Sequence, residues 1–459
     1  MIPMTLAEIA TIVSGTLHAD PAVRVTGPVE YDSRKLRPGG LFVAFDGSTV
    51  DGHDFADEAM AAGAVAVLGS RQLDGVPTVV VDDQLQALGR LARTLVDRLP
   101  ELTIVGLTGS SGKTTTKDLI AQLASRVGPT VAPPGSLNNE LGFPYTVLQA
   151  GAATRFLILE MGARGLGHLK YLAEIAPPRI GVVLNVGFAH IGEFGSVDTI
   201  ARAKAELIES LPPDGVAVLN ADDPRVRAMS ERTGARVVLA GETPDATVRA
   251  EDVTLDDRGR ASYTLIMSGF RGPVRLGLPG RHQVGNSLAT AAVARELGMP
   301  DNELPAALGD LRLVSSRRMD VFDRADGVTV IDDSYNANPA SAAAALHALA
   351  AMGRERRTVA VLGYLAELGE FERGGHEEVG QLAAQLGVGL LIVVGQAAAP
   401  IRDGAAAVAT WEGESVLATD QEAAIALLRG ALRPGDVVLV KGSRYRTWDV
   451  ADFLREVGP

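Results

Sequence analysis

The stretch TGSSGKTTTK, Thr108 to Lys117, decides the fold of this chain. It follows the apolar run Leu102 to Leu107, which predicts a short buried strand, and it leads into DLIAQLA, where apolar residues recur at helical spacing. Gly109 and Gly112 permit a tight turn whose N–H groups point inward, and a helix that begins near Thr114 adds the positive end of its dipole. The pattern therefore predicts a phosphate-binding loop between a strand and a helix.

The residue types inside this loop suit a nucleotide and a magnesium ion. We expect Lys113 to reach the β- and γ-phosphates and the hydroxyl of Thr114 to bind Mg²⁺. Only the shorter GxxGKT core is present, because Leu107 stands where the full GxxxxGK[ST] pattern has glycine. A surface turn is the alternative, and the flanking strand and helix favour the phosphate loop. The residues expected at the nucleotide are Gly109, Ser110, Ser111, Gly112, Lys113, Thr114 and Thr115.

Composition limits the class of protein. The 459 residues suffice for about three domains, and 46% hydrophobic with 22% charged residues is typical of a soluble α/β protein. A net charge of -13 leaves no general basic field for nucleic acid or an anionic membrane. The chain has no cysteine, the segment MIPMTLAEIA is unlike a signal peptide, and no apolar run approaches the ~20 residues of a membrane span. We therefore expect a cytoplasmic protein without membrane insertion.

The first segment alternates helix-like and strand-like pieces and predicts a small α/β domain. Two polar loops, Tyr31 to Gly40 and Asp46 to Phe55, bracket the predicted strand Leu41 to Phe45. Loops beside a strand often carry binding residues, although Asp, Ser, Gly and Pro are also what turns require. The segment Asp97 to Thr103 is the expected linker to the phosphate loop.

Two polar residues follow strands of the second segment, which runs to about Ser316. Glu160 ends the predicted strand Phe156 to Leu159, and His190 follows the next one. Because the carboxyl ends of strands converge on the ligand crevice of a doubly wound sheet, both side chains are expected near Lys113. A metal-ligand role is favoured for Glu160, whereas a lone histidine is more often structural.

A lysine on the apolar face of a predicted helix is the most unusual feature. In TIARAKAELIESL, Thr199 to Leu211, Lys204 lies four residues after Ile200 and four before Ile208, both on the apolar stripe. One interpretation is snorkelling, with the amine in water. The other is a desolvated amine of lowered pKa that adds CO₂ and becomes an anionic carbamate able to bind a metal. Spacing alone leaves both open.

Two further segments carry candidate nucleotide contacts. Asn286 lies near the start of the Ala-rich helix within Leu278 to Ala294, where it is either a helix cap or a partner for an adenine edge. The third segment, from about Arg317, again alternates strands and helices and predicts a second open α/β unit. Its loop Asp332 to Pro339 is either a turn or a ribose and base contact.

Taken together, the motifs resemble the Mur ligase family over nearly the whole chain. They are TGSSGKTTTK, NNELGFP (Asn138 to Pro144), LEMGARGLGHL (Leu159 to Leu169), NVGFAHIGEFGS (Asn185 to Ser196), AKAE (Ala203 to Glu206) and DDSYNANP (Asp332 to Pro339). NNELGFP and DSYNANP favour the members that use D-alanyl-D-alanine as acceptor. DSRKLRPGGLFVAFDG and DGHDF are shared with the sister ligase that adds the third amino acid.

The resemblance implies a three-domain α/β architecture. Residues 1–100 would bind the UDP end of the substrate, residues 101–316 would form a central ATPase domain with a P-loop type of sheet, and residues 317–459 would form a Rossmann-like domain. It also implies that ATP phosphorylates the terminal carboxylate of UDP-MurNAc-tripeptide and that the amine of D-Ala-D-Ala attacks the acyl phosphate. We expect two Mg²⁺ ions, small-molecule partners, no nucleic acid and a monomeric chain.

Site residues follow from the same resemblance, motif by motif. Lys113, Glu160, His190 and Lys204 would be catalytic, with Thr114 and Glu160 on one Mg²⁺ and His190 and carbamylated Lys204 on the second. Further ATP contacts would come from Asn286, Asp333, Tyr335 and Arg318, with Arg317 the open alternative to Arg318. Substrate contacts would come from Ser33, Arg34, Gly47, Asp51, Asn138, Asn139, Lys441 and Arg444.

Other functions stay open at this point. The near alternatives are the sister ligase that adds a diamino acid and a ligase similar to folylpolyglutamate synthetase. A nucleotide switch belongs to a different class, and the chain has no NKxD guanine-reading signature after the phosphate loop. Family members usually carry a Gly-Asp pair where this chain has Gly363-Tyr364, so no catalytic role is assigned there.

Overall fold

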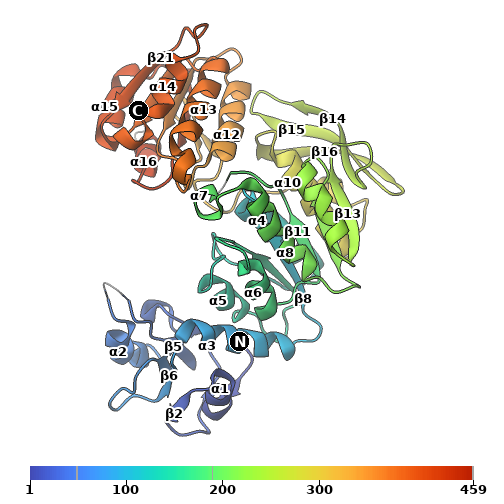
Figure 1. Ribbon diagram of the computed structural model, residues 1–459, viewed down its shortest axis with the longest axis vertical. Coiled ribbons are helices and arrows are strands. Elements are labelled where there is room, and N and C mark those ends of the chain that lie inside the picture. Colours follow the sequence, from blue (N-terminus) through green and yellow to red (C-terminus); the bar gives the residue numbers. More distant parts are fainter. Residues whose placement is uncertain (48–49, 189, 457–459) are drawn as a thin grey trace.

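The computed structural model describes residues 1–47, 50–188 and 190–456, arranged in three successive α/β domains (Figure 1). The N-terminal domain has a five-stranded sheet in the order β2-β7-β6-β5-β4, parallel except for β2 against β7. The strands of this sheet are β2 (Thr16–His18), β4 (Val29–Glu30), β5 (Gly40–Val43), β6 (Ala64–Gly69) and β7 (Thr78–Val80), and β1 (Met4–Thr5) and β3 (Arg24–Val25) form a separate antiparallel pair. Its helices are α1 (Leu6–Val13), α2 (Ala56–Ala61) and α3 (Gln84–Asp97), with 3₁₀ turns η1 (Ser33–Lys35) and η2 (Gly52–Phe55).

Helix α3 connects the first two domains. The Asp83 side chain accepts a hydrogen bond from Gln86 N and caps the amino end of α3. One face of the helix is apolar, with buried residues Leu88, Leu91 and Leu95 at helical spacing. The helix packs against α1 of its own domain and against α5 and α6 of the central domain, so it fixes one domain on the other.

The central domain has a nine-stranded sheet in the order β16-β15-β14-β13-β12-β11-β8-β10-β9. Strands β8 to β14 are parallel, and β15 and β16 continue the sheet as an antiparallel meander. The strands are β8 (Thr103–Thr108), β9 (Thr130–Val131), β10 (Phe156–Glu160), β11 (Ile180–Val183), β12 (Val216–Asn220), β13 (Arg236–Gly241), β14 (Val248–Leu255), β15 (Arg260–Met267) and β16 (Phe270–Pro279). The helices are α4 (Lys113–Val127), α5 (Gly142–Val147), α6 (His168–Ile175), α7 (Ile191–Phe194), α8 (Val197–Glu209), α9 (Pro224–Arg227), α10 (Gln283–Glu296) and α11 (Leu304–Gly309), with the 3₁₀ turn η3 (Ala228–Arg232).

The C-terminal domain has a six-stranded sheet in the order β17-β18-β22-β19-β20-β21, parallel except for the edge strand β17. The strands are β17 (Asp320–Asp323), β18 (Thr329–Asp332), β19 (Thr358–Leu362), β20 (Leu390–Val394), β21 (Glu414–Ala418) and β22 (Val437–Lys441). The helices are α12 (Pro339–Met352), α13 (Glu372–Gln385), α14 (Pro400–Ala406), α15 (Gln421–Ala431) and α16 (Trp448–Glu456), with 3₁₀ turns η4 (Gly369–Phe371) and η5 (Gln396–Ala398).

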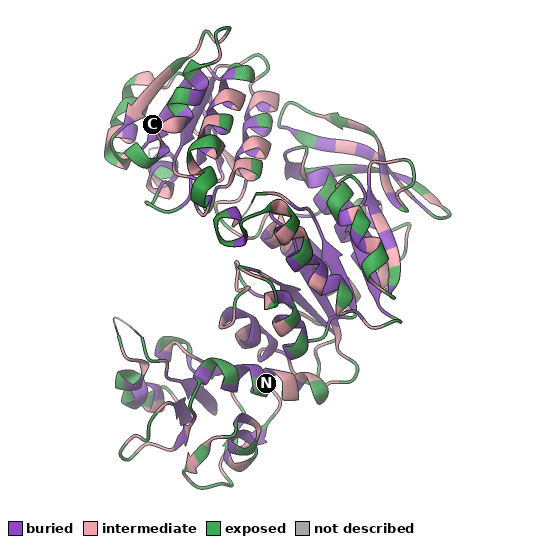
Figure 2. Cartoon of the chain, in the orientation of Figure 1, coloured by how far each residue is buried: buried purple, intermediate pink, exposed green. Residues whose placement is uncertain are grey.

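Helices cover the sheets and bury their strands. Figure 2 shows buried strands inside each domain and exposed residues on the outer faces of the helices. Parallel strands covered on both faces read as continuous apolar runs, and β19 and β20 are buried at every position. This confirms the α/β fold class expected from the sequence. No helix among the described residues has the length and apolar character needed to cross a membrane.

Strand order brings the polar loops to one edge of the central sheet. Strand β8 lies between β10 and β11, and Glu160 at the end of β10 pairs with Leu107 of β8. The phosphate loop, Glu160 and the segment after β11 therefore share the carboxyl edge of the sheet.

Candidate active site

A cleft of about 430 Å³ lies at this edge and is lined by the central and C-terminal domains. The central domain contributes the phosphate loop and Glu160, and the C-terminal domain contributes Arg318 and Asp333. The predicted residues among its lining are Ser110, Ser111, Gly112, Lys113, Thr114, Thr115, Asn138, Asn139, Glu160, His190, Asn286, Arg318, Asp333, Tyr335 and Lys441.

One asparagine holds the phosphate loop in shape, and a second lies close against it. Asn185, after β11, accepts hydrogen bonds from Ser110 N at 3.0 Å and Ser111 N at 2.9 Å through its Oδ1. Gly112 is left-handed with φ 79°, and a Cβ there would lie 2.9 Å from Asn286 Oδ1. Glycine is needed at this position both for the backbone angle and for the close approach of Asn286.

The side chain of Lys113 folds back onto the phosphate loop. Its Nζ donates a hydrogen bond of 2.8 Å to Gly109 O. Burial lowers the pKa of the Lys113 amine, the Glu160 carboxylate opposes this shift, and the Arg318 guanidinium adds to it. Lys113 and Arg318 thus concentrate positive charge from two domains at one place, which favours an anionic ligand there.

Three donors fix the carboxylate of Glu160. Thr114 Oγ1 donates to Oε2 at 2.8 Å, while Ser136 Oγ and Asn138 Nδ2 donate to Oε1 at 2.8 and 2.5 Å. A hydroxyl and a carboxylate side by side are hard oxygen ligands of the kind that Mg²⁺ prefers. The residues present therefore fit a magnesium ion, and Asn138, expected at the substrate, contacts the carboxylate directly.

Lys204 is buried on the inner face of α8, with only 5% of the residue exposed. Burial, and then the charge of Lys113, lowers the pKa of its amine well below the ordinary value. An amine removed from solvent in this way is unlike a snorkelling lysine, whose head group stays in water. The burial of Lys204 is the setting that the second interpretation requires, and the carbamate itself stays a prediction.

His190 lies on the short segment between β11 and α7 and has the left-handed angles φ 60° and ψ 22°. Its Nδ1 is 2.5 Å from Oε2 of Glu367, which belongs to the C-terminal domain. Together with Glu193, these two side chains form a group whose potential ligand atoms all lie within 4.8 Å of one another.

The amino end of α10 lies beside the phosphate loop. Asn286 is inside this helix and donates to Gln283 Oε1 at 2.9 Å, so it is not the helix cap that the sequence left open. His282, just before the helix, lines the same cleft, and its buried Nδ1 has no hydrogen-bond partner among the described residues. The pKa of the His282 imidazole is lowered, chiefly because the ring is buried.

Arg317 and Arg318 point in different directions. Arg317 Nη2 donates to Asp452 Oδ2 at 3.0 Å, on helix α16. Arg318 lines the cleft, with its guanidinium carbon 4.3 Å from the centre of the Tyr335 ring. The structure therefore brings Arg318, and not Arg317, to the phosphate loop.

The loop after β18 is braced by a buried lysine. Lys441, 2% exposed, donates through Nζ to Asp333 Oδ2 at 2.5 Å and to Asn336 O at 3.0 Å. Asp333 in turn accepts a hydrogen bond from Met319 N at 3.0 Å. Lys441 thus supports the loop that carries Asp333, and its neighbour Arg444 is an exposed residue 3.6 Å from Glu367 Oε1.

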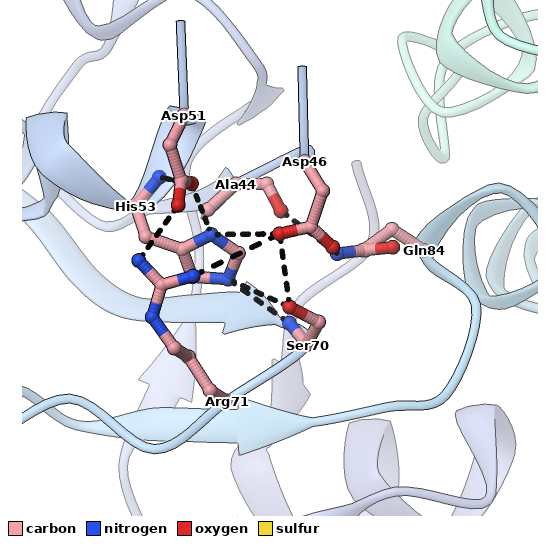
Figure 3. Close-up of polar contacts among 7 residues, drawn as sticks. All are labelled: Ala44, Asp46, Asp51, His53, Ser70, Arg71 and Gln84. Atoms are coloured by element: carbon pink, nitrogen blue, oxygen red, sulfur yellow. Dashed lines mark hydrogen bonds and ion pairs between the residues drawn. The ribbon is translucent and has the colours of Figure 1, made fainter. Parts of the chain in front are cut away.

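The predicted UDP contacts lie in the N-terminal domain, away from this cleft. Figure 3 shows Asp51 engaged by neighbouring side chains: His53 Nδ1 at 2.6 Å and Arg71 Nη2 at 2.8 Å. The backbone N–H of His53, which donates to Asp51 Oδ1 at 2.9 Å, and these two side chains hold the pKa of the Asp51 carboxyl well below its usual range. Ser70 N donates to His53 Nε2 at 3.0 Å, so the imidazole proton is on Nδ1 and faces Asp51.

The other predicted N-terminal residues belong to the same surface loops. Ser33 is buried at the start of η1, and the exposed Arg34 pairs with Asp32 at 2.8 Å. A Cβ on Gly47 would lie 2.2 Å from Val50 O, so the loop requires glycine there. Ser48 and Thr49 of the predicted loop Asp46 to Phe55 lie outside the described residues.

Sequence reasoning did not single out several residues that the structure brings to these sites. They are Ser136, Asn185, His282, Asn336 and Glu367 at the cleft or its rim, and His53 and Arg71 in the N-terminal domain. Asn185 follows a strand as Glu160 does, so its position in the sequence could have indicated that it lies at the site. Glu367 gave none, because its partner is in another domain.

An open parallel sheet with a glycine-rich loop, a threonine hydroxyl and a carboxylate at its carboxyl edge is the arrangement of a phosphate-loop protein. Family models agree: residues 107–294 match the Mur ligase middle domain, 317–444 the Mur ligase glutamate ligase domain, and 28–95 the Mur ligase family catalytic domain. The chain belongs to the Mur ligase family.

Individual relatives and solved structures are similar over nearly their full lengths. The UDP-N-acetylmuramoyl-tripeptide--D-alanyl-D-alanine ligase of Mycobacterium bovis is 48% identical, with 96% of each chain covered. The ligase of the same name from Escherichia coli is 35% identical, with 100% of each covered. A crystal structure of MurF from Acinetobacter baumannii matches with a TM-score of 0.89 at 30% identity over 99% of both chains. MurF ligase from Thermotoga maritima, solved in complex with ADP, matches with a TM-score of 0.81 at 30% identity over 94% of this chain and 98% of that one.

Proposed function

We propose that this chain is an ATP-dependent ligase that joins the amine of D-alanyl-D-alanine to the terminal carboxylate of UDP-N-acetylmuramoyl-tripeptide, a step of peptidoglycan precursor synthesis. The observation that carries the proposal is the Thr114–Glu160 pair beside Lys113, in a cleft that Arg318 enters from another domain. The names of the similar proteins support the choice of substrates.

Phosphoryl transfer depends on positioning and charge neutralisation and needs no protein nucleophile. The γ-phosphoryl group of ATP would lie over the phosphate loop, between the Lys113 amine and the Arg318 guanidinium. Transfer to the tripeptide carboxylate gives an acyl phosphate and ADP. The free amine of D-Ala-D-Ala then attacks the acyl carbon, phosphate leaves, and the amine loses a proton as the amide forms.

Magnesium has a matching donor set. Thr114 and Glu160 would hold the first ion, with Ser136 and Asn138 orienting the carboxylate. His190 and carbamylated Lys204 would hold the second. Bound Mg²⁺ neutralises charge on the phosphate oxygens. The lowered pKa of the Lys204 amine supports the carbamate, because only a neutral amine adds CO₂, releasing one proton as it does so.

The nucleotide and the UDP end would occupy different domains. Asn286, Asp333 and Tyr335 would contact the adenosine part of ATP, and the aromatic ring of Tyr335, 46% exposed, is suited to packing beside a base. Ser33, Arg34, Gly47 and Asp51 would face UDP, while Asn139, Lys441 and Arg444 would border the peptide. Because these groups belong to three domains, catalysis requires the domains to close around the substrates. We also infer a monomer that acts in the cytoplasm.

The test is phosphate release from ATP with purified chain, UDP-MurNAc-tripeptide and D-Ala-D-Ala. The proposal predicts release only when both substrates are present, together with a pentapeptide product detected by mass spectrometry. Release that is insensitive to either substrate would contradict it. UDP-MurNAc-dipeptide with a diamino acid tests the sister ligase, and a folate with glutamate tests a folylpolyglutamate-synthetase-like ligase. Slow hydrolysis without product would favour a nucleotide switch.

A further inference from the structure

A single residue of the C-terminal domain holds the segment that carries His190. Glu367, in the loop between β19 and α13, places its carboxylate 2.5 Å from His190 Nδ1. Its backbone oxygen also accepts a hydrogen bond of 3.2 Å from Gly192 N. One residue therefore contacts the central domain twice, once through its side chain and once through its backbone.

The two backbones touch beside this pair. A Cβ on Gly192 would lie 2.6 Å from Gly369 N, and a Cβ on Gly369 would lie 2.6 Å from Gly192 Cα. His190 and Glu367 both have positive φ, 60° and 67°, which non-glycine residues adopt only where the surrounding structure enforces it. The contact is therefore specified by the backbone on both sides and is not a chance meeting of two exposed side chains.

The Glu367 carboxylate determines which nitrogen of His190 is available. Nδ1 lies 2.5 Å from the carboxylate without a well-directed hydrogen bond among the described residues. A carboxylate this close favours a proton on Nδ1, which leaves the lone pair on Nε2. Histidines that bind metals commonly have a carboxylate on the other ring nitrogen, which fixes both the tautomer and the ring direction. The other carboxylate oxygen of Glu367 is 3.6 Å from the guanidinium of the exposed Arg444.

We propose that Glu367 is a positioning residue that orients His190 as a ligand of the second cation, so that this cation site is complete only when the C-terminal domain is docked on the central domain. The proposal rests on the role given to His190 in the proposed function. It makes the position of the C-terminal domain a condition for cation binding in the central domain.

The test counts the Mn²⁺ ions that the full chain binds in the presence of a non-hydrolysable ATP analogue. Mn²⁺ is a paramagnetic substitute for Mg²⁺, and the electron paramagnetic resonance signal of free Mn²⁺ measures how much stays unbound. The wild-type chain should bind two ions. Glu367→Ala should leave the first ion unchanged and weaken the second about 10- to 100-fold, the usual effect of losing an orienting carboxylate. Glu370→Ala removes an exposed acid three residues away and should change neither ion.

Two more variants separate positioning from other roles. Glu367→Gln keeps an acceptor for Nδ1–H and should recover most of the second-ion affinity; if it binds as weakly as Glu367→Ala, the carboxylate is itself a ligand and positioning is wrong. Gly192→Ala retains both the Glu367 and the His190 side chains but forces their backbones apart, so the carboxylate moves away from the imidazole and the second ion should bind more weakly as well. An intact first ion in each variant reports that the central domain is folded.

The outcomes also distinguish this proposal from the one on which it rests. If wild type binds two ions and Glu367→Ala binds both as tightly, positioning by Glu367 is overturned while the ligase assignment stands. If wild type binds one ion only, the second cation site is wrong, and the positioning proposal fails with it. Ligation measured on the same wild-type sample tests the ligase assignment separately.

Discussion

The hydroxyl of Thr114 lies 2.8 Å from Glu160 Oε2, although 46 residues separate the two in the chain. Parallel pairing of β8 with β10 produces this contact, because it ends both strands at one edge of the sheet. Removal of the hydroxyl should weaken the first Mg²⁺ site. We expect Thr114→Ala to shift the Mg²⁺ dependence of ligation upward by at least about tenfold. Thr114→Ser retains a hydroxyl and serves as the matched control, and equal Mg²⁺ dependence of the two variants would refute the assignment.

Lys113→Ala should lower the ligation rate about 10²- to 10³-fold, because it removes charge stabilisation of the transferring phosphoryl group. The fold should persist. Burial already disfavours the charged form of the Lys113 amine, and the carboxylates of Glu160 and Glu367 oppose this shift. Without Lys113, Glu160 keeps its three hydrogen-bond donors and Glu367 keeps its contact with His190. Phosphate release and a thermal melt measure the two effects. A near-normal rate would remove Lys113 from the mechanism.

The adjacent arginines should respond differently to truncation. Arg318→Ala should raise KM for ATP, because Arg318 faces the cleft beside Lys113. Arg317→Ala should instead destabilise the chain by about 1 kcal/mol through loss of the hydrogen bond to Asp452, with KM for ATP little changed. Steady-state kinetics and urea unfolding of both variants check this. The opposite pattern would assign the phosphate contact to Arg317.

Lys204→Ala should be nearly inactive and should regain part of its activity when formate or acetate is added, because a small carboxylate can replace the carbamate. Lys204→Arg, which cannot carry a carbamate and fills the space, should gain nothing. Ligation is measured against carboxylate concentration, with chloride at equal ionic strength as the control. Absence of rescue at every concentration would speak against a carbamate.

The buried carboxyl of Glu30, at the contact between the N-terminal and central domains, should make the stability of the chain depend on pH. It is 7% exposed, and Tyr145 Oη donates to its two oxygens at 3.1 and 3.2 Å. Burial nevertheless raises the pKa of the Glu30 carboxyl. Since the folded-state pKa exceeds the unfolded one, Glu30 contributes stability below the usual carboxyl pKa, about 4.3, and this contribution is lost as pH rises through the folded-state value.

Glu30→Gln should therefore raise the free energy of unfolding at pH 8 relative to wild type and have a smaller effect at pH 4. Urea unfolding at the two pH values provides the measurement. Glu101→Gln, at an exposed site, is the control and should behave alike at both. A larger gain at pH 4 than at pH 8 would contradict the sign of the pKa shift.

Most of the cleft could be predicted because its residues follow strands. Lys113, Glu160 and His190 each come after an apolar run, and the carboxyl ends of parallel strands meet wherever those strands form one sheet. Lys204 was visible as a charge on an apolar helical stripe. The fate of its amine was not, since spacing cannot tell a head group in water from one enclosed by neighbouring elements.

The sequence by itself determined the α/β class and the phosphate loop, because both depend on residue types at short and regular spacing. Its motifs also carried the resemblance to the family. Only the tertiary structure decided that Arg318 faces the cleft while Arg317 pairs with Asp452, that Asn185 supports the loop, and that Glu367 meets His190. These contacts depend on strand order and on how one domain docks on another. Neither is encoded in the local periodicity of the chain, because both are set by packing among residues far apart in sequence.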